Sequence, residues 1–395
     1  MTRTIKPLYS ANIRNFPRIS TVGIVGAGLM GVSIAAANAR CGIPVCIYDA
    51  NTEILRTVPE RILQELDNIP NEIKRENFAS LVTCGTMKDM KKCALVVECI
   101  IERVEEKREL YAKLEKIMSR DAFLVSNTST IPIEVLSEEL RFPHRFAGLH
   151  FLHPVRHREL VEVIPSTKTE EGIVQRLCDY ALYIEKTPLC VADCPGFVIN
   201  RLLQPYLNEA LKMLQHGVPM NMVEEAACDF GMPWGPLRIM DEIGIDTVFH
   251  SGRVLFEAYP EYVTPSPIII SMVKKKLLGK KTGEGFYCWR EHETASENGL
   301  LRENHLQNKM PVFNPAAEKI IHSWKTQDSL RFSVSSLKEL SYRLMTAMAM
   351  EAARIVHDEV VTEKDEVDMA AVTGLGFPAH LGGPIKWLAK EIKPG

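Results

Sequence analysis

Two residues suited to proton transfer, His150 and Glu162, lie twelve positions apart. His150 ends an apolar run that begins at Phe146, and Glu162 has hydrophobic residues on both sides. A histidine titrates near neutral pH, so it can take a hydroxyl proton while a hydride leaves the same carbon. A lone carboxylate is costly to bury, so Glu162 is expected to have a partner, and it can orient and stabilise an imidazole. We interpret the pair as a candidate base for oxidising a secondary alcohol. The alternative is a structural strand-end histidine and a glutamate that faces solvent.

A glycine-rich segment near the N-terminus has the spacing of a dinucleotide-binding turn. The motif Gly-x-Gly-x-x-Gly follows a strand predicted at 21–25 and opens a helix predicted to reach Arg40. Its glycines permit a tight turn, a close approach to a pyrophosphate and close packing of helix on strand, and the helix N-terminus attracts phosphates. Asp49 ends the next strand, where its carboxylate can bind ribose hydroxyls and repel the extra phosphate of NADP. We therefore predict NAD, with a flavin or a nucleotide-free turn as alternatives. The predicted cofactor-binding residues here are Gly26, Ala27, Gly28, Leu29, Met30, Gly31 and Asp49.

The first half of the chain alternates predicted strands and helices. Strands are predicted at 21–25, 44–48, 95–100, 122–126 and 146–151, with helices after the first, second and third of them. The helix at 53–67 contains Pro59, which is expected to kink it or mark a fresh start. Such alternation indicates a parallel, doubly wound sheet. We predict an α/β Rossmann-type dinucleotide-binding domain, followed by mostly α-helical C-terminal domains.

The second half has helical periodicity and an internal repeat. The residues around Arg201 and Glu209 resemble those around Arg343 and Glu351, and the Gly-x-Pro and Gly-Pro turns that follow them also match. Chance similarity between amphipathic helices is the alternative. The segment 291–335 is polar and aperiodic. The predicted domains are a lead-in at 1–18, an NAD-binding Rossmann domain at 19–197, a helical substrate or dimerisation-type domain at 198–295, a linker at 296–335 and a second copy of the helical domain at 336–395.

Composition argues against several classes of protein. The 395 residues are 46% hydrophobic and 25% charged, and a formal net charge of −3 gives no reason to expect a nucleic-acid partner. The ten cysteines include no C-x-x-C pair, so no metal site is predicted and the thiols are expected to be reduced, as in an intracellular protein. No stretch is convincing as a membrane span. We expect a cytoplasmic location, with a mitochondrial one left open by the basic N-terminus.

Beyond the glycine motif, seven segments resemble the 3-hydroxyacyl-CoA dehydrogenase family. The resemblance covers about residues 20–290 and is closest to the dehydrogenase half of the bifunctional fatty-acid oxidation enzymes, which carry a second copy of the helical domain. It implies oxidation of (S)-3-hydroxyacyl-CoA to 3-oxoacyl-CoA with NAD, in fatty-acid β-oxidation. Because this sequence shows no hydratase half, hydratase or thiolase partner proteins are expected. The segments are Val-Val-Glu-Cys-Ile-Ile-Glu (96–102), Ser-Asn-Thr-Ser-Thr (126–130), Gly-Leu-His-Phe-Leu-His-Pro-Val (148–155), Leu-Val-Glu-Val-Ile (160–164), Pro-Gly-Phe-Val-Ile-Asn-Arg (195–201), Gly-Met-Pro-Trp-Gly-Pro (231–236) and Gly-Lys-Lys-Thr-Gly-Glu-Gly-Phe-Tyr (279–287).

The resemblance also implies roles for individual residues. It makes His150 and Glu162 the catalytic pair, and Ser129 and Asn200 the hydrogen-bond partners of the substrate's 3-oxygen and thioester region. It makes Glu102, Lys107 and Lys281 contacts of NAD. Taken alone, Ser129 is equally a turn residue, Asn200 a helix cap, and the three charged residues ordinary surface charges. Glu98 is expected to be buried and receives no role.

Two departures from the family pattern bear on the substrate. His153 stands where the family commonly has asparagine, and Glu65 and Glu72 stand where it has a serine and a lysine that contact coenzyme A. Two acids repel phosphates, although Lys74 and Arg75 are nearby. Two alternatives therefore stay open: a dehydrogenase of another hydroxy acid, such as a sugar acid, and a non-catalytic NAD-binding subunit of an oxidation complex.

Overall fold

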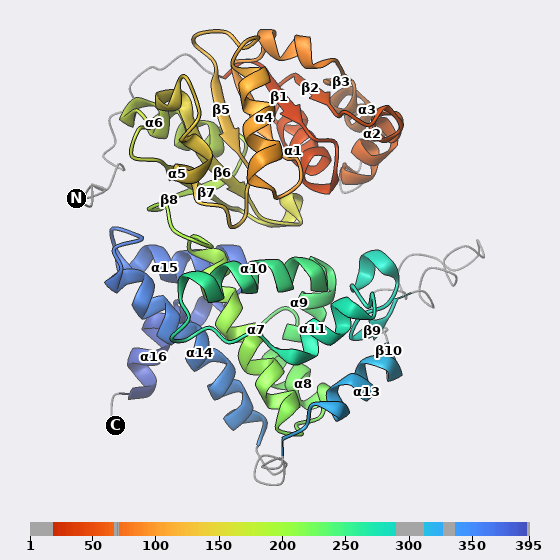
Figure 1. Cartoon of the computed structure of the whole chain (residues 1–395), viewed down its shortest axis with the longest axis vertical. Coiled ribbons are helices and arrows are strands. Elements are labelled where there is room, and N and C mark those ends of the chain that lie inside the picture. Colours follow the sequence, from red (N-terminus) through yellow and green to blue (C-terminus); the bar gives the residue numbers. More distant parts are fainter. Residues whose placement is uncertain (1–18, 67–68, 70, 290–311, 327–335, 393–395) are drawn as a thin grey trace. The chain divides into compact units, whose positions relative to one another are not determined.

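The computed structural model describes residues 19–66, 69, 71–289, 312–326 and 336–392 (Figure 1). The chain divides into two compact units. The first contains residues up to Val198 together with Ile355–Gly374, and the second contains Ile199–Arg354 together with residues from Leu375 onward. The division near residue 198 falls next to the predicted end of the first domain. The predicted lead-in at 1–18 lies outside the described residues.

The first unit is built on an eight-stranded sheet in the order β3-β2-β1-β4-β5-β6-β7-β8. The strands from β1 to β6 pair in parallel, as expected for a doubly wound fold, and the predicted Rossmann-type class is confirmed. The strands are β1 (Val22–Val25), β2 (Val45–Tyr48), β3 (Val82–Cys84), β4 (Leu95–Glu98), β5 (Phe123–Ser126), β6 (Phe146–Phe151), β7 (Leu160–Pro165) and β8 (Thr187–Cys190).

The sheet continues beyond the predicted strands with a reversal, because β7 runs antiparallel to β6. Only residues 152–159 connect these two strands, and a crossover to a parallel neighbour needs a dozen residues or more. β8 pairs in parallel with β7, so both strands run against the rest of the sheet. This reversal places the residues of β6 and β7 directly opposite each other.

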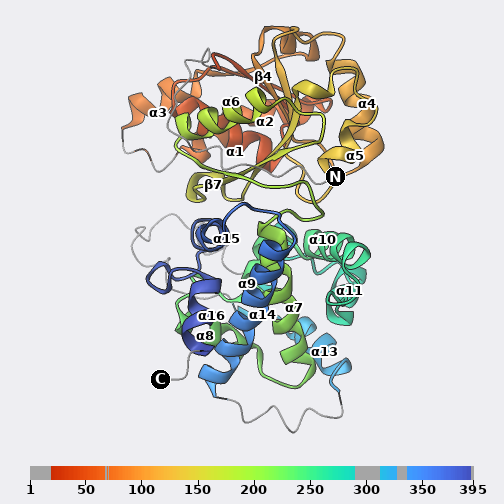
Figure 2. The ribbon, with the colours of Figure 1, turned by 90° about the vertical axis from the view of Figure 1, so that its left-hand side faces the viewer.

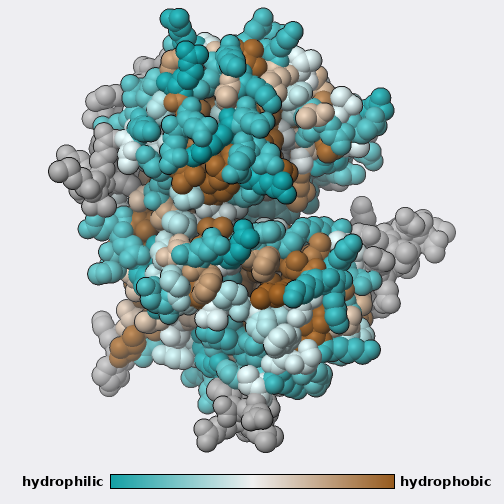
Figure 3. Space-filling model, viewed as in Figure 1, coloured by the Kyte–Doolittle hydropathy of each residue, from teal (hydrophilic) through white to brown (hydrophobic). Residues whose placement is uncertain are grey.

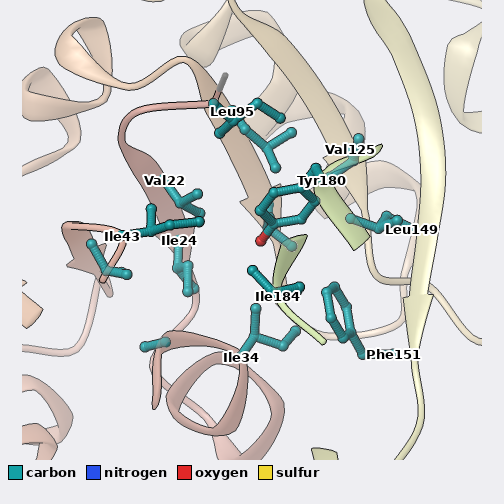
Figure 4. Packing of buried hydrophobic residues seen from close by; sticks show 14 of the residues in the cluster. Val22, Ile24, Ile34, Ile43, Leu95, Val125, Leu149, Phe151, Tyr180 and Ile184 are labelled. Atoms are coloured by element: carbon teal, nitrogen blue, oxygen red, sulfur yellow. The ribbon is translucent and has the colours of Figure 1, made fainter. Parts of the chain in front are cut away.

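Helices cover both faces of the sheet. Ile34 of α1 and Tyr180 of α6 share an apolar cluster with Ile24 of β1 (Figure 4). On the other face, the ring of Tyr111 in α4 packs on that of Phe146, with centroids 5.2 Å apart. The helical segments of this unit before residue 199 are α1 (Leu29–Arg40), α2 (Thr52–Glu65), α3 (Glu72–Ala79), η1 (Met87–Lys92), α4 (Val104–Leu114), α5 (Ile133–Ser137), η2 (Pro143–Arg145), η3 (Val155–His157) and α6 (Glu171–Tyr183).

Helix α2 continues through Pro59 rather than starting afresh there. A proline removes the N–H that would bind the carbonyl four residues earlier, here the carbonyl of Leu55. The thiol of Cys84 donates to that carbonyl, with Sγ and O 3.5 Å apart. The helix is also capped, because the side chain of Asn51 accepts from the N–H of Glu53.

The chain after Val198 is mostly helical, as predicted (Figure 2). The range 296–335, predicted as a linker, contains β10, which pairs antiparallel with β9, and the helix α13. In the described part of the chain, no helix is both long and apolar enough to cross a membrane. The elements are α7 (Ile199–Gln215), α8 (Met220–Phe230), α9 (Pro236–Ile243), α10 (Ile245–Ala258), α11 (Pro267–Lys274), η4 (Lys280–Thr282), β9 (Tyr287–Cys288), β10 (Val312–Phe313), α13 (Pro315–Ser323), α14 (Leu337–His357), α15 (Lys364–Ala370), η7 (Ala371–Leu375), η8 (Ala379–Leu381) and α16 (Pro384–Ile392).

Within the second unit, α7 and α14 exchange a reciprocal pair of ion pairs. Nε of Arg201 lies 2.7 Å from Oε1 of Glu351, and Nη2 of Arg343 lies 2.5 Å from Oε1 of Glu209. Each arginine precedes the glutamate of its own helix by eight residues. Reciprocal contacts of this kind are typical of two equivalent elements related by a twofold axis.

Candidate active site

The structure brings His150 and Glu162 together. Because β6 and β7 are antiparallel, the two residues are register partners on neighbouring strands. Nδ1 of the imidazole lies 2.6 Å from Oε2 of the carboxylate. His150 is 6% exposed and Glu162 is fully buried, so solvent barely weakens the contact. A carboxylate only accepts, so Nδ1 carries the hydrogen and Nε2 is the nitrogen left to take a proton.

The other oxygen of Glu162 is also held in place. Oε1 accepts a hydrogen bond of 2.8 Å from the backbone N–H of Val198. The residue before it, Phe197, has a φ of 48°, a left-handed conformation that is rare for a bulky side chain. Its ring lies beside the imidazole of His150, with centroids 5.9 Å apart. The carboxylate therefore has one oxygen for the imidazole and one for the backbone, which fixes its orientation.

Glu98, which sequence reasoning left without a role, is the centre of a buried network. It ends β4 and is fully buried. Its carboxylate accepts from Nζ of Lys107 at 2.6 Å, from the hydroxyl of Tyr111 at 2.6 Å, and from that of Ser126 at 2.8 Å. The backbone N–H of Ile100 donates to it at 2.7 Å. The only sequence signal was an acid at the end of an apolar run, because its partners come from α4 and β5.

A second carboxylate, Glu102, connects this network to the turn after β5. Oε2 of Glu102 lies 3.3 Å from Nζ of Lys107, and Oε1 accepts from the hydroxyl of Thr128 at 2.6 Å and from the N–H of Ser129 at 2.8 Å. Partial burial acts to raise the pKa of Glu102, but the Lys107 ammonium and these hydrogen bonds hold that pKa below its usual value. The charged form of Glu102 thus holds the backbone of Ser129.

Lys107 is 1% exposed and lies between the two glutamates. Burial acts to lower the pKa of this ammonium, but Glu98 and Glu102 raise the pKa above its usual value. Lys107 is therefore charged at neutral pH, and it links two carboxylates at the end of β4.

The glycine turn after β1 has the geometry that the motif predicts. Gly26 has a φ of 107°, and a Cβ there would collide with the backbone of Cys99, whereas a Cβ on Gly31 would collide with the carbonyl of Gly26. A Cβ on Gly28 would meet no atom within 4 Å. The absence of a side chain at Gly28 therefore serves no internal packing, and it leaves the backbone at the start of α1 open to a bound group.

Asp49 lies beside this turn, as the motif predicts. Its Oδ2 accepts from the N–H of Ala27 at 2.8 Å, and its Oδ1 accepts from the N–H of Asn51 at 2.8 Å.

Two large apolar residues of the first unit are exposed: Leu29 is 57% exposed and Ile101 is 58% exposed. They are exceptions, because the viewed face of this unit is mostly hydrophilic (Figure 3). A dinucleotide fits this surface, which combines open glycine backbone, a helix N-terminus, a carboxylate and exposed apolar side chains. When bound, such a cofactor supplies a hydride acceptor.

Asn200 and Lys281 belong to the second unit. Asn200 lies in the first turn of α7, which begins one residue earlier, so it is not the cap that local reasoning offered as an alternative. Nζ of Lys281 lies 2.5 Å from Oδ1 of Asp246, and the lysine side chain is 47% exposed. The roles that the resemblance gives these two residues stay predictions.

The candidate residues of the first unit come from one edge of the sheet. The strands β1, β4, β5 and β6 are consecutive neighbours, and the glycine turn, Glu98, Ser129 and His150 lie at or just after their carboxyl ends. This is the edge at which open α/β sheets bind ligands. Oδ1 of Asn127 accepts from the N–H of Phe151 at 2.8 Å, which ties the ends of β5 and β6 together. The edge combines a buried histidine–glutamate pair with a glycine turn of the dinucleotide-binding type.

Comparison with known proteins agrees with this architecture. The family described as 3-hydroxyacyl-CoA dehydrogenase, NAD binding domain, matches residues 21–194, and the C-terminal domain of the same family matches residues 196–289. The fatty acid oxidation complex subunit alpha of Acinetobacter baumannii is 30% identical over 94% of the chain. That alignment covers 51% of the relative, so the chain spans about half its length.

Solved structures give the same result. 3-Hydroxybutyryl-CoA dehydrogenase from Escherichia coli K12 has a TM-score of 0.77 at 25% identity, with 95% of this chain and 92% of that chain covered. (S)-3-Hydroxybutyryl-CoA dehydrogenase from Ralstonia eutropha has a TM-score of 0.64 at 31% identity, with 69% of this chain and 99% of that chain covered.

A Rossmann domain with an open glycine turn, followed by a helical region, is the architecture of an NAD-binding protein, and the prediction of NAD is confirmed. The chain belongs to the 3-hydroxyacyl-CoA dehydrogenase family, whose two domains together match most of its length.

Proposed function

We propose that the chain oxidises (S)-3-hydroxyacyl-CoA to 3-oxoacyl-CoA with NAD, as a step of fatty-acid β-oxidation. The observation that carries the proposal is the buried contact of 2.6 Å between His150 and Glu162 at the edge of the sheet that also holds the glycine turn. An aligned imidazole–carboxylate pair is well suited to removing a hydroxyl proton.

In this proposal, Nε2 of His150 accepts the proton of the substrate's 3-hydroxyl group as hydride leaves the same carbon. The imidazole becomes positively charged, and the carboxylate of Glu162 stabilises that charge through Nδ1. The backbone N–H of Val198 keeps the carboxylate aimed at the ring. Both side chains are buried, so little solvent competes for the proton.

The remaining site residues have supporting roles. Ser129 and Asn200 are proposed to bind the 3-oxygen and thioester region of the substrate, and Glu102, Lys107 and Lys281 to act on the cofactor side. Support for Ser129 is its place in a turn whose backbone is held by Glu102. We propose the domain limits of 19–197, 198–295 and 336–395 with this assignment.

A second candidate is a dehydrogenase of a different hydroxy acid on the same scaffold. It rests on His153 and on Glu65 and Glu72, which depart from the family pattern. A non-catalytic NAD-binding subunit is the weaker alternative, because a buried and fully aligned histidine–glutamate pair has no purpose in it. The relative in an oxidation complex supports hydratase or thiolase partners and a cytoplasmic location as parts of the proposal.

The test is NADH formation with 3-hydroxyacyl-CoAs of increasing chain length, compared with free hydroxy acids. We expect turnover with the CoA thioesters and a strong preference for them over the free acids. Turnover with only the free acids would favour the second candidate. No NADH from any of these substrates would favour the non-catalytic subunit.

A further inference from the structure

The first unit has a cavity of about 510 Å³ that none of the residues discussed above explains. It is lined by the second half of α1, by the loop that contains η3, and by the segment between α6 and β8. Its size lies within the range of small-molecule sites, which is about 300–1,000 Å³.

Cationic side chains from all three segments line this cavity. Arg40 comes from α1, Arg156 and Arg158 from the loop after β6, and Lys186 from the segment before β8; His157 lies among them. In the described part of the chain, no carboxylate lies within ion-pair distance of these four cations. Nζ of Lys186 instead donates to the backbone carbonyls of Val155 and Arg158, at 2.6 and 2.9 Å.

Three carboxylates also line the cavity: Glu65, Glu159 and Glu185. Glu159 and Glu185 are exposed, whereas Arg158 and Lys186 are half-buried. Burial lowers the pKa of Lys186, and the neighbouring charge of Arg40 lowers it further, whereas Glu159 and Glu185 raise it. Burial also lowers the pKa of His157, with Arg156 as the next contribution. Arg40 and Lys186 thus repel each other even with these carboxylates nearby, and a bound anion would relieve that repulsion.

We propose that this cavity binds the phosphate groups of the coenzyme A part of the substrate, with Arg158 and Arg40 as the principal contacts. The inference rests on the proposed function and adds to it a binding site for the far end of the same ligand. Guanidinium groups match phosphate geometry with paired donors, and those of Arg40 and Arg158 make no hydrogen bond to the described residues.

The position of the cavity fits a ligand that also reaches the base. Arg156 follows His150 by six residues, so their Cα atoms lie within about 20 Å of each other. A coenzyme A thioester carries its reacting carbon and its phosphates at opposite ends of a flexible arm. Such a ligand can contact His150 in β6 with one end and the cavity beside the loop between β6 and β7 with the other. The cations also offset Glu65, an acid that sequence reasoning expected to repel coenzyme A.

The test separates the phosphates from the rest of the substrate. Kinetics with 3-hydroxybutyryl-CoA are compared with those of the same acyl group on pantetheine, which lacks the phosphates. For Arg158→Gln and Arg40→Gln, we expect KM for the CoA thioester to rise roughly tenfold, as one lost charge-assisted contact implies, with kcat nearly unchanged. KM for the pantetheine thioester should not change, and Arg158→Lys should recover part of the loss.

Arg120→Gln is the matched control, because Arg120 is exposed just before β5, at the edge of the sheet opposite to the one where His150 lies.

Equal effects of Arg158→Gln on the two thioesters, or no effect on either, would overturn the proposal. If the wild type oxidises neither thioester, the proposed function fails on its own. Calorimetry with coenzyme A then tests whether the cavity binds its phosphates. Weaker coenzyme A binding by Arg158→Gln supports it. Tight binding of adenosine 3′,5′-bisphosphate without binding of coenzyme A would point to a free phosphorylated ligand and overturn it.

Discussion

At the scale of single residues, the site depends on buried carboxylates that each hold a specific partner. Glu162 holds the imidazole of His150 through one oxygen and the N–H of Val198 through the other. Glu102 holds the turn of Ser129 and shares the ammonium of Lys107 with Glu98. The hydrogen bonds and the Lys107 charge favour the ionised form of Glu102, so the contribution of Glu102 to stability depends on pH.

Glu102 gives the clearest case. Its folded-state pKa is below the usual 4.5, so its charged form contributes stability above that pH, and the contribution is lost as the pH falls through the folded value. We expect Glu102→Gln to lower the free energy of unfolding at about pH 7, and the difference from the wild type to shrink below about pH 4.5. Urea denaturation at both pH values measures this. Glu60→Gln, an exposed change on α2, is the control. A difference that is constant with pH would contradict the assignment.

At the scale of elements, the network around Glu98 joins three elements that meet at the ligand-binding edge. Glu98 ends β4, Lys107 and Tyr111 lie on α4, and Ser126 ends β5. Both members of the ion pair are at most 1% exposed, so the loss of either leaves the other buried without its main partner.

We expect Glu98→Gln and Lys107→Met each to cost about 3–5 kcal/mol of unfolding free energy, because each leaves a buried group without its main charged partner. The double variant should cost clearly less than the sum of the two single changes. A double-mutant cycle by urea denaturation measures the coupling. Additive costs below about 1 kcal/mol each would show that the network contributes little to stability.

Much of this site was predictable where its signal is local. The glycine spacing, Asp49 at a strand end, and an acid among hydrophobic residues identified the turn and the pair of His150 with Glu162. The direction of β7 was not predictable from apolar patterning, because a buried strand has the same pattern whichever way it runs. The partners of Glu98 come from other elements, so no local pattern indicated them.

The cations that line the cavity could not be recognised from local sequence patterns either. Arg40 and Lys186 lie in different segments far apart in the sequence, and each alone is typical of an ordinary surface charge.

The helix α13 was missed because it lies in a range that is polar overall, although Ala317, Ile320 and Ile321 form a short buried face.

At the scale of the whole molecule, the reciprocal ion pairs of α7 and α14 support a duplicated helical domain. The two pairs differ in burial: Arg201 and Glu351 are 1% and 3% exposed, whereas Arg343 and Glu209 are 27% and 18% exposed. The helices α7 and α14 thus form two chemically equivalent pairs in different environments within one chain.

This difference predicts unequal costs. Glu351→Ala should lower the free energy of unfolding by about 3–5 kcal/mol, because it leaves the Arg201 guanidinium buried without the carboxylate that balances its charge. Glu209→Ala should cost about 1 kcal/mol, because water can replace much of the lost contact with Arg343. Chemical denaturation of the two variants provides the comparison. Equal costs would mean that burial does not decide the strength of these pairs.

The duplication also bears on assembly. If the second copy covers the surface that a twofold partner would otherwise cover, the chain has no need to pair with itself through α7. We expect a single-chain mass by size-exclusion chromatography with light scattering. A clean dimer would count against this interpretation of the repeat.

His150 is the residue on which the proposed oxidation depends most directly. In a wild-type and His150→Ala comparison with (S)-3-hydroxybutyryl-CoA, we expect NADH formation to fall about 10²–10⁴-fold in the variant, the usual contribution of a positioned general base. Its affinity for NAD, measured by calorimetry, should be nearly unchanged. His144→Ala, which alters an exposed histidine just before β6, should keep wild-type turnover. Wild-type turnover by His150→Ala would contradict the assignment.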